Sequence, residues 1–451
     1  MAGAALSLRE RWDVRPAGAV ERAFYGRHVE RVLPESVADV AEAVRYAEAR
    51  RMPIIPAGLG SRAYLGDPPP DGALVISLER LGSILRYEPG DFTIGAAAGL
   101  PLAELREVLE RNGQEVAVDL PRAAEGTVGG QLACALPGPR RARTGSIRSA
   151  LIGIRAMRGG GRVYKAGGMV VKNVAGYEVG RLHAGALGTA GIVLEANFKL
   201  RPRPAVRRGA AAATGSRSDA VALARALRAR GLEPACLEVL DAGAGRRLDR
   251  ACPSAAPEPG AAPGAPWRVV WLFEGNEALV RWLEEEAQRL CAERRVVHLA
   301  RLEPPEAEAV FDLLCRVWEP EEPAAGSEAI VRCSVLPSRV GDLLDGLDAL
   351  FGPLEDLERE VTADAAGGQV AVRWRGARPR LEAPLAALPE VVRRVEGVAS
   401  LVFLPAAMRR RFGYRLLEEP SAALARRVRR VFDPLGLFCP GRVDGVVDVK
   451  Y

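Results

Sequence analysis

The sequence is poor in histidine and in aromatic residues. Among 451 residues there are 3 histidines, and aromatic side chains make up 5% of the chain. The histidines stand at positions 28, 183 and 298, so no histidine pair or His/Glu cluster falls within residues 205–415. Because zinc and related metals are held by clustered His, Cys and carboxylate side chains, we expect no metal site.

The cysteines also lack the spacing that is typical of disulfide frameworks and metal sites. The 7 cysteines are an odd number, scattered along the chain, and never spaced C-x-x-C. This spacing argues against a disulfide framework, a zinc site and an iron–sulfur cluster carried by this chain. We expect reduced, mostly buried thiols in a cytoplasmic protein.

Long apolar runs and blocks of basic residues are missing as well. No window approaches the ~18 apolar residues of a membrane-spanning helix, and residues 1–11 lack the apolar core of a signal peptide. The net charge is +6, but Arg and Glu alternate throughout without interleaved aromatic residues. We therefore expect no nucleic-acid partner, and membrane association only through a protein partner.

The remaining pattern predicts an α+β protein of two or three domains. In the first ~200 residues we expect helices at 36–51 and 102–112, strands at 52–55, 73–78 and 192–200, and a hairpin over 81–97. Residues 205–415 alternate helical and strand-like segments, which suits an antiparallel sheet covered by helices on one side. A basic amphipathic helix at 422–432 and a turn-rich tail complete the chain.

Glycine-rich turns are the most informative feature present. One follows an apolar strand at Pro56-Ala-Gly-Leu-Gly-Ser61 and leaves successive N–H groups free to meet an anion. Its spacing fits neither a Rossmann fingerprint nor a P-loop. Others lie at Thr127-Val-Gly-Gly130, Gly145-Ser-Ile-Arg148, Lys172-Asn-Val-Ala-Gly-Tyr177 and Leu187-Gly-Thr-Ala-Gly-Ile192. Since ordered glycine costs entropy, this density suggests one long ligand held between two lobes.

The order and spacing of these motifs resemble the PCMH-type, or vanillyl-alcohol-oxidase-type, FAD-binding family, and most closely the FAD-binding subunits of bacterial glycolate oxidases. The likeness is strong over residues 30–204 and clear again at 431–442. It implies an N-terminal extension at 1–27, a two-lobed FAD-binding domain at 28–204 and an α+β cap domain at 205–415. A C-terminal helix and tail at 416–451 would return to the FAD domain.

The resemblance also implies which residues contact FAD. The pyrophosphate would lie against Pro56, Ala57, Gly58, Leu59, Gly60 and Ser61. The flavin and ribityl chain would follow Thr127, Val128, Gly129 and Gly130, and then Gly145, Ser146 and Ile147. Gly191 and Ile192 would close the adenine side. No histidine stands before residue 56 in a Gly-His-Ser-like turn, so the FAD should be noncovalent.

Several polar residues keep two interpretations open. Lys172 and Tyr177 are the candidates for catalytic groups, together with Asn173 and Arg181 of the same motif, but these side chains would equally serve to hold a tight chain crossing. Arg148 and Arg442 would meet either a phosphate or a carboxylate. The family commonly has Asp at the position of Glu178 and often Asn at that of Cys439, so these departures bear on FAD affinity.

The implied function is that of an FAD-binding subunit in a glycolate (2-hydroxy acid) oxidase or dehydrogenase complex. Such a complex contains a catalytic flavoprotein subunit and an iron–sulfur subunit, and this chain would be a second flavin site or a structural partner. One alternative is a self-sufficient FAD-dependent hydroxy-acid or alcohol dehydrogenase. Another is a scaffold that kept the fold without flavin.

Overall fold

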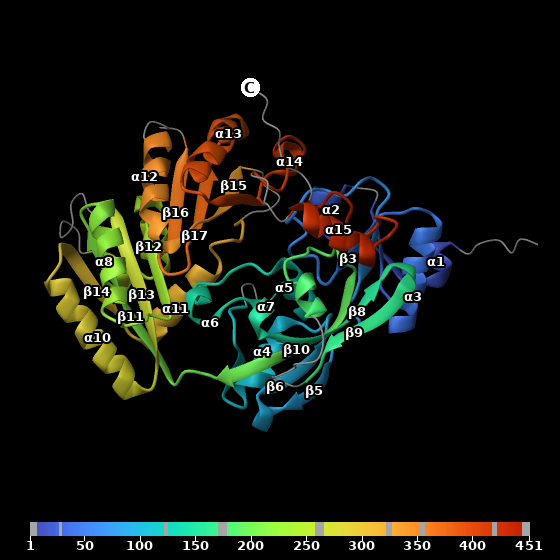
Figure 1. Cartoon of the computed structure of the whole chain (residues 1–451), viewed down its shortest axis with the longest axis horizontal. Coiled ribbons are helices and arrows are strands. Elements are labelled where there is room, and N and C mark those ends of the chain that lie inside the picture. Colours follow the sequence, from blue (N-terminus) through green and yellow to red (C-terminus); the bar gives the residue numbers. More distant parts are fainter. Residues whose placement is uncertain are drawn as a thin grey trace, which may run out of the picture.

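Three β-sheets form the framework of the computed structural model (Figure 1), which describes residues 7–26, 29–120, 125–169, 178–257, 266–321, 327–351, 357–416 and 422–443. Two small sheets of four and six strands lie in the N-terminal half of the chain, which we call the first lobe. An eight-stranded sheet from residues 206–403 forms the second lobe, the cap. The predicted α+β architecture is confirmed.

The four-stranded sheet has the order β1-β2-β4-β3, with β2, β4 and β3 parallel. Its strands are β1 (Val14–Pro16), β2 (Glu30–Val32), β3 (Ile54–Ala57) and β4 (Leu74–Ser77). Helix α3 (Val37–Ala49) connects β2 to β3, and its buried residues recur with helical spacing against the sheet. Ser36 caps this helix by accepting a hydrogen bond from the Asp39 N–H. Short helices α1 (Leu8–Arg11) and α2 (Ala19–Tyr25) precede the sheet.

The six-stranded sheet is antiparallel, with the order β5-β6-β10-β8-β9 and β7 paired to β10. Its strands are β5 (Ile84–Glu88), β6 (Thr93–Ala97), β7 (Gln114–Val116), β8 (Leu151–Arg158), β9 (Arg162–Gly167) and β10 (Ile192–Pro202). The helices that belong to this part are α4 (Leu102–Glu110), α5 (Val128–Cys134), α6 (Arg141–Thr144) and α7 (Ile147–Ala150). A 3-10 turn, η3 (Val179–His183), leads back to β10.

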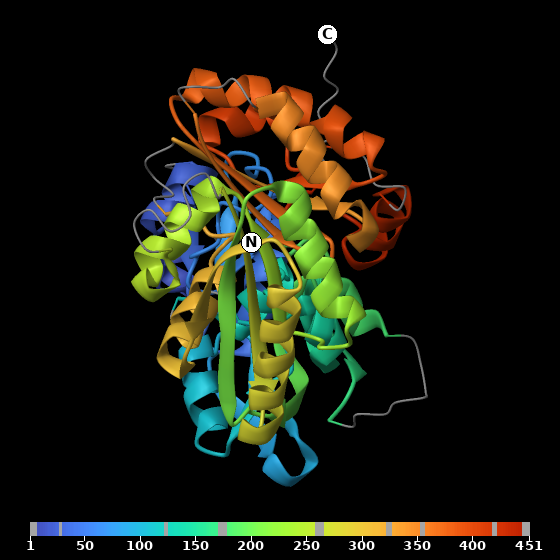
Figure 2. The same ribbon diagram turned by 90° about the vertical axis from the view of Figure 1, so that its left-hand side faces the viewer.

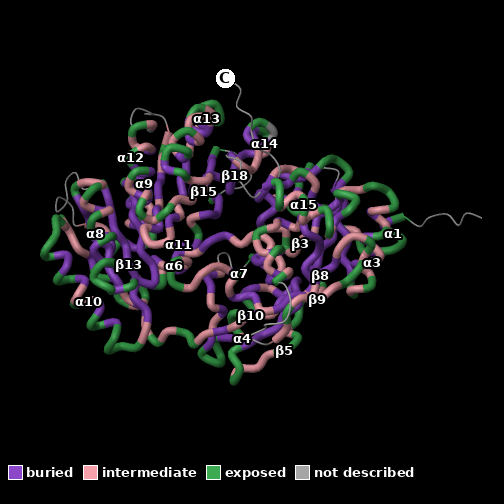
Figure 3. Tube along the Cα trace, viewed as in Figure 1, coloured by how far each residue is buried: buried purple, intermediate pink, exposed green. Residues whose placement is uncertain are grey.

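The cap sheet is antiparallel, with the order β14-β11-β13-β12-β16-β17-β15-β18. Its strands are β11 (Val206–Thr214), β12 (Cys236–Leu240), β13 (Trp267–Gly275), β14 (Val296–Leu302), β15 (Glu328–Ser334), β16 (Glu358–Asp364), β17 (Gln369–Arg375) and β18 (Val398–Phe403). One face, which we call the outer face, packs against α8 (Arg217–Ala229), α10 (Glu277–Ala292), α12 (Val340–Phe351) and α13 (Arg378–Arg394) (Figure 2). The buried residues follow the strands beneath these helices (Figure 3).

The opposite, inner face of the cap sheet is covered only in part. Helices α9 (Ala242–Ala251) and α11 (Pro304–Cys315) pack on strands β11 to β13. Near β15, β17 and β18, the inner face meets the first lobe, where Phe403 packs edge-on against Tyr64. The short helix α14 (Ala406–Phe412) and the helix α15 (Ala422–Phe432) follow β18.

Three cap elements were not expected from the sequence. Strand β11 contains four consecutive alanines with no alternation, and it became a central strand because small residues fit beneath the flanking helices. Its Gly209 leaves room for the neighbouring strand, since a Cβ there would lie 1.9 Å from the Trp271 carbonyl oxygen. Helix α9 and strand β16 have weaker periodicity and were also missed. Tertiary packing therefore outweighed local pattern at these sites.

The end of the described chain returns to the first sheet. The Ile54 N–H donates to the Leu437 carbonyl at 2.7 Å, and the Cys439 N–H donates to the Ile54 carbonyl at 2.9 Å. Fully buried Arg409 joins the cap to the first lobe by donating to the carbonyl oxygens of Tyr64, Leu401 and Val402. The domain boundaries remain a proposal; strand β1 of the first sheet lies within the expected N-terminal extension.

Candidate functional site

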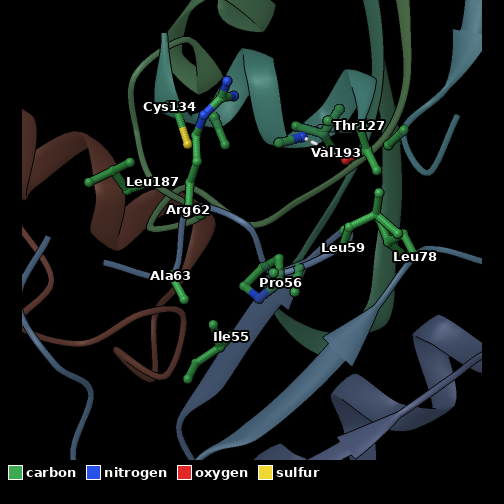
Figure 4. Close-up of a pocket in the computed structure, with 18 of the residues that line it drawn as sticks. Ile55, Pro56, Leu59, Arg62, Ala63, Leu78, Thr127, Cys134, Leu187 and Val193 are labelled. Atoms are coloured by element: carbon green, nitrogen blue, oxygen red, sulfur yellow. Dashed lines mark hydrogen bonds between the residues drawn. The ribbon is translucent and has the colours of Figure 1, made fainter. Parts of the chain in front are cut away.

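A pocket in the first lobe brings together the glycine-rich turns of the two small sheets (Figure 4). The loop after β3, the start of α5 and the segment before β10 form its walls, with an empty volume of about 870 Å³ that includes space open to solvent. The pocket therefore lies where a ligand held between the two sets of glycine-rich turns is expected.

The first wall is the turn after β3. Arg31 donates to the Gly58 carbonyl oxygen at 2.8 Å, and Ser77 Oγ donates to the same oxygen at 3.1 Å. These bonds hold the carbonyl oxygen of residue 58 on the β2–β4 side of the turn. Within the described residues, no hydrogen bond accepts from the N–H groups of residues 58 to 61. Such a run of free N–H groups suits an anionic group of a ligand.

The second wall is the first turn of α5. Thr127 is the N-cap, and its Oγ1 accepts a hydrogen bond from the Gly130 N–H at 3.2 Å. The two walls approach each other closely, because a Cβ on Gly58 would lie 2.2 Å from Thr127 Oγ1. On the far side of α5, a Cβ on Gly129 would lie 2.8 Å from the Ala98 Cβ. These two glycines are therefore required by packing within the protein itself.

Positive charge dominates the pocket. Arg62 and Arg442 line it, and no described lining residue is an aspartate or glutamate. Arg62 donates to Gln131 Oε1 at 2.7 Å and lies next to Cys134 at the base of α5 (Figure 4). Arg62 also forms an ion pair with Glu319 at 3.5 Å. Since an arginine keeps its charge at any ordinary pH, the described lining carries two fixed cations, of which Arg62 is already paired with a carboxylate.

Arg442 has one buried hydrogen-bond donor that no described residue accepts from. Its Nη2 donates to the Tyr25 hydroxyl at 2.9 Å and to the Ala63 carbonyl oxygen at 3.2 Å. Its Nη1 is buried and has no hydrogen-bond partner among the described residues. Burial raises the pKa of Tyr25 to about 12, so that group stays neutral beside the arginine. An unsatisfied, buried, charged donor in a ligand-sized pocket fits a phosphate or another anionic oxygen.

Neutral groups form the third side of the pocket. His183 is 2% exposed, and its Nε2 lies 2.5 Å from the Tyr164 hydroxyl. Burial lowers the pKa of His183 to about 4, so the imidazole is uncharged near neutral pH. Gly188 and Gly191 both have positive φ, and a Cβ on Gly191 would lie 2.3 Å from the Met157 carbonyl oxygen. A side chain at either position would therefore be strained.

Most of the predicted cofactor contacts meet at this pocket. Its lining includes Pro56, Ala57, Gly58, Leu59, Gly60, Ser61, Thr127, Gly129, Gly130, Gly191 and Arg442. Val128, Ile147 and Ile192 instead have their side chains in the hydrophobic core of the first lobe. Gly145 and Ser146 lie between α6 and α7, outside the lining. For these five, contact with a cofactor remains a proposal.

The other polar predictions are not found among the described lining of the pocket. Lys172, Asn173 and Tyr177 lie outside the described residues. Arg148 is exposed and does not line the pocket, in contrast to Arg442. Arg181 forms an ion pair with Glu178 at 2.7 Å. Cys439 is buried beside the Gly188 turn, where a Cβ on that glycine would lie 3.1 Å from its sulfur.

Leu187 and Gly188 belong to the predicted glycine-rich turn before β10, whereas other lining residues were not predicted, namely Tyr25, Arg62, Ala63, Leu78, Ala98, Cys134, His183 and Val193. Arg62 directly follows the predicted turn, so its position next to Ser61 was a usable signal. Tyr25 and His183 reach the pocket through pairing and packing between distant segments. No local pattern in the sequence indicates that.

Two searches of the described residues gave negative results. No group of three or more His, Cys, Asp or Glu side chains is placed to hold a metal ion there. No described helix has both the length and the apolar character needed to cross a membrane.

Comparison with known proteins identifies the first lobe. Residues 31–167 match the family described as FAD binding domain. The chain is 38% identical over 164 residues to glycolate oxidase subunit GlcE of Escherichia coli (strain K12), covering 36% of this chain and 46% of the relative. It is 33% identical over 172 residues to a D-2-hydroxyglutarate dehydrogenase of Xanthomonas citri pv. viticola (strain LMG 965 / NCPPB 2475 / ICMP 3867 / CFBP 7660), covering 38% and 36%. The matches thus span less than half of each of these relatives.

The fold has a counterpart among solved structures. The crystal structure of p-cresol methylhydroxylase with substrate bound superposes with a TM-score of 0.71 over 94% of this chain and 90% of the other, at 14% identity. At that identity the likeness shows the fold alone, and it extends over the cap as well as the first lobe. The predicted resemblance to PCMH-type FAD-binding proteins is confirmed.

Proposed function

We propose that the chain is the FAD-binding subunit of a glycolate (2-hydroxy acid) oxidase or dehydrogenase complex, because residues 31–167 match the family described as FAD binding domain. The observation that carries this proposal is the pocket, in which two glycine-rich walls face two arginines and no carboxylate. A dinucleotide with a pyrophosphate is a long, anionic ligand of matching character. The relative named glycolate oxidase subunit GlcE supports both the substrate class and the status of a subunit.

The residues that would hold FAD follow from the pocket. The free N–H groups of residues 58 to 61 and the unsatisfied Nη1 of Arg442 suit the pyrophosphate. Thr127, Gly129 and Gly130 offer a flat backbone surface for the ring system. Bound FAD supplies a hydride acceptor for oxidation of an alcohol carbon. His183 and Tyr164 hold no charge at neutral pH, which leaves the arginines to balance the phosphates.

The proposed partners are a catalytic flavoprotein subunit and an iron–sulfur subunit. The scattered cysteines of this chain lack cluster spacing, so electrons that leave a flavin singly would need another chain to receive them. This chain would provide a second flavin site or a structural surface for its partners. We place the complex in the cytoplasm, with any membrane contact made through partners.

A second candidate is a self-sufficient dehydrogenase for a 2-hydroxy acid. The likeness to a D-2-hydroxyglutarate dehydrogenase, whose name does not describe a subunit, favours it. Such an enzyme needs a base within reach of the substrate hydroxyl. Lys172 and Tyr177 remain the proposed candidates for that role.

The first experiment is a visible absorption spectrum of the purified chain. We expect oxidised-flavin bands, with the flavin released into the supernatant by acid precipitation because the FAD is noncovalent. Flavin that stays with the precipitated polypeptide contradicts noncovalent binding. A colourless chain that cannot be reconstituted with FAD indicates the flavin-free scaffold.

The second experiment separates the two candidate functions. The pure chain should reduce dye with glycolate only after addition of the partner subunits. Turnover by the chain alone at ordinary enzyme rates, about 1–1,000 per second, identifies the self-sufficient dehydrogenase. In that case Lys172→Met and Tyr177→Phe, each with FAD still bound, test which of these side chains is the base.

Glycine variants test the pocket directly. Gly60 has φ +76°, and a Cβ there would lie 2.7 Å from the Glu21 carboxyl carbon. Gly60→Val should therefore lose FAD. Gly72→Val is the matched control, because Gly72 has φ +77° but nothing within 4 Å. Equal FAD content in the two variants would show that the turn after β3 does not hold the cofactor.

A further inference from the structure

The inner face of the cap sheet carries a group of polar side chains that the proposed FAD pocket does not use. In β15, Val331 and Cys333 belong to the core under the outer helices, so Arg332 and Ser334 point to the inner face. The same alternation places Gln369, Asp364 and Glu238 on that face, from β17, β16 and β12. We call these five residues the inner-face patch.

Strand register places the patch in one area. Glu238 is paired with Asp364, Asp364 with Gln369, and Gln369 with Ser334, across four neighbouring strands. Ser334 Oγ donates to Gln369 Oε1 at 3.0 Å. Arg332 lies two residues before Ser334, on the same face. Residues paired in this way have side chains within about 5 Å of each other, so the patch is a continuous polar surface.

This surface is partly open to solvent although it lies in the middle of an eight-stranded sheet. Arg332, Ser334 and Gln369 are each half-buried, whereas their neighbours on the outer face are completely covered. Helices α9 and α11 cover the inner face over β11 to β13, and α9 also packs on β16, where a Cβ on Gly243 would lie 1.8 Å from the Arg359 carbonyl oxygen. Arg332, Ser334 and Gln369, on β15 and β17, keep part of their surface accessible to solvent.

A carboxyl pair forms one side of the patch. Asp364 is 5% exposed; its Oδ1 accepts from the N–H groups of Ala366 and Gly367, but its Oδ2 is buried without a hydrogen-bond partner among the described residues. Burial, and then Asp364, raise the pKa of Glu238 well above its ordinary value. Burial raises the pKa of Asp364 to about 6. The pKa values of both carboxyl groups are thus raised, and Asp364 is the one that titrates near pH 6.

Two arginines, one from each lobe, form the other side. Arg141 lies at the start of α6, next to Arg140, whose guanidinium reaches Glu274 of the cap sheet at 3.0 Å. Burial, and then the nearby Arg332, lower the pKa of Arg141, and Asp364 offsets part of that effect. Arg332 Nε is buried without a hydrogen-bond partner among the described residues. The charges of Arg141 and Arg332 thus act on one another, and neither arginine forms an ion pair among the described residues.

We propose that Arg141 and Arg332 bind the carboxylate of a small organic acid between the two lobes, with Gln369, Ser334 and Asp364 around it. Guanidinium groups match a carboxylate through paired N–H donors, and the bound anion would relieve the repulsion between the two cations. The inference rests on the proposed function for its substrate class, a small 2-hydroxy acid. It adds the residues that would recognise the acid end of that substrate.

The carboxyl pair makes this binding dependent on pH. The charged groups that act on Asp364 are Glu238 on β12, Arg141 on α6 and, from the outer face, Arg228 on α8, together with the N–H groups of the β16–β17 turn. As the pH rises above about 6, Asp364 loses its proton and repels an incoming carboxylate. Affinity for a small acid should therefore fall several-fold between pH 5 and pH 8, and Asp364→Asn should remove much of that fall.

The test is isothermal titration of the full chain with oxalate, an unreactive small dicarboxylate, at pH 6. Arg141→Met and Arg332→Met should each weaken oxalate binding at least tenfold. Arg143→Met, an exposed arginine on the same short helix, should change it less than twofold. Arg332→Lys keeps the charge and should restore part of the affinity, which separates recognition from misfolding.

The outcomes also separate this inference from the proposed function. The inference is overturned if both methionine variants bind oxalate with the affinity of the wild type. It is also overturned if the wild type binds no oxalate at an oxalate concentration of about 10 mM, tenfold above a dissociation constant of ~1 mM. Equal affinity for sulfate overturns the assignment to a carboxylate. Running the titration with and without added FAD makes the tests independent. A flavin-free chain that binds oxalate through both arginines contradicts only the flavin proposal.

Discussion

Two consecutive residues, Arg140 and Arg141, enter the space between the lobes and meet opposite surroundings. Arg140 is 3% exposed and pairs with Asp119, Glu115 and Glu274. Burial by itself lowers the pKa of Arg140, but these three carboxylates together raise it well above its ordinary value. Arg141 forms no ion pair within the described part of the chain, and burial, followed by the charge of Arg332, lowers its pKa.

The difference separates an arginine that holds the structure together from one that is available to a ligand. The Arg140 site also includes Arg207, which pairs with Glu274 and stacks on the Phe311 ring at 3.9 Å. Every charge there has an opposite charge within the protein. At Arg332, as at Arg442 in the pocket, a buried donor has no hydrogen-bond partner among the described residues, which is characteristic of binding sites.

The largest effect on stability is expected from replacing Arg140. Arg140→Met leaves buried Asp119 and Glu274 without their shared cation, and we expect the free energy of unfolding to fall by about 3–5 kcal/mol. Arg141→Met removes a repelled charge and should change it by less than about 1 kcal/mol. Urea denaturation of both variants measures this. Equal losses would show that the two arginines have the same structural role.

Replacing Arg442 should have its main effect on FAD affinity. Arg442→Met removes charged hydrogen bonds of about 1.5–3 kcal/mol, so FAD should bind roughly 10–100-fold more weakly. Fluorescence titration of FAD measures this, with circular dichroism as a check on folding. Arg148→Met, at an exposed arginine of similar standing in the sequence, is the control. If the two variants bind FAD equally well, Arg442 does not contact the cofactor.

The pH dependence of stability at His183 tests whether the arginines alone supply the positive charge of the pocket. Its pKa is about 4 in the folded protein, below the ordinary value of 6.5, so its contribution to stability is present above pH 6.5. That contribution is lost as the pH falls toward 4, on the order of 2 kcal/mol between pH 7 and pH 5. His183→Gln should flatten this part of the stability profile. An unchanged profile would mean that the imidazole is charged in the fold.

Replacing Asp364 should have the smallest effect on stability, and this effect should depend on pH in the direction opposite to that of His183. Its folded pKa, about 6, lies above the ordinary 3.8, so its stabilising contribution is complete below pH 3.8 and is lost as the pH rises through 6. Asp364→Asn should therefore gain on the wild type by about 1 kcal/mol between pH 5 and pH 8. Thermal unfolding at the two pH values measures the gain. A constant difference between the proteins would contradict the shifted pKa.

The sequence predicted those parts of the fold that depend on local periodicity. Helix α3, the hairpin of β5 and β6, and most cap helices follow amphipathic or alternating patterns and were placed to within a few residues. The alanine-rich strand β11 carries no such pattern. Its place is decided by the bulky residues of β13 beside it, including Trp271, so only the assembled sheet defines it.

The candidate site likewise has parts that the sequence predicts and parts that it does not. Glycine turns next to strands are visible in the sequence, and the turn after β3 and the start of α5 do meet at the pocket. The carboxyl pair and the two facing arginines were not foreseen, since they come from β12, β16, β15 and α6. Glu238 and Asp364 are neighbours only because two strands far apart in sequence are paired in register. Distance in the chain hides such groups from any local pattern.

The return of residues 437–442 to the first sheet has a consequence for biosynthesis. Ile54 finds its backbone partners on the last described segment, and Arg442 fills the pocket from there. A ribosome therefore synthesises the first lobe and the whole cap before residues 437–442 can complete the pocket. Ligand binding in the finished pocket accordingly follows synthesis of the cap. A chain truncated before residue 437 would keep every glycine turn and still lack a finished site.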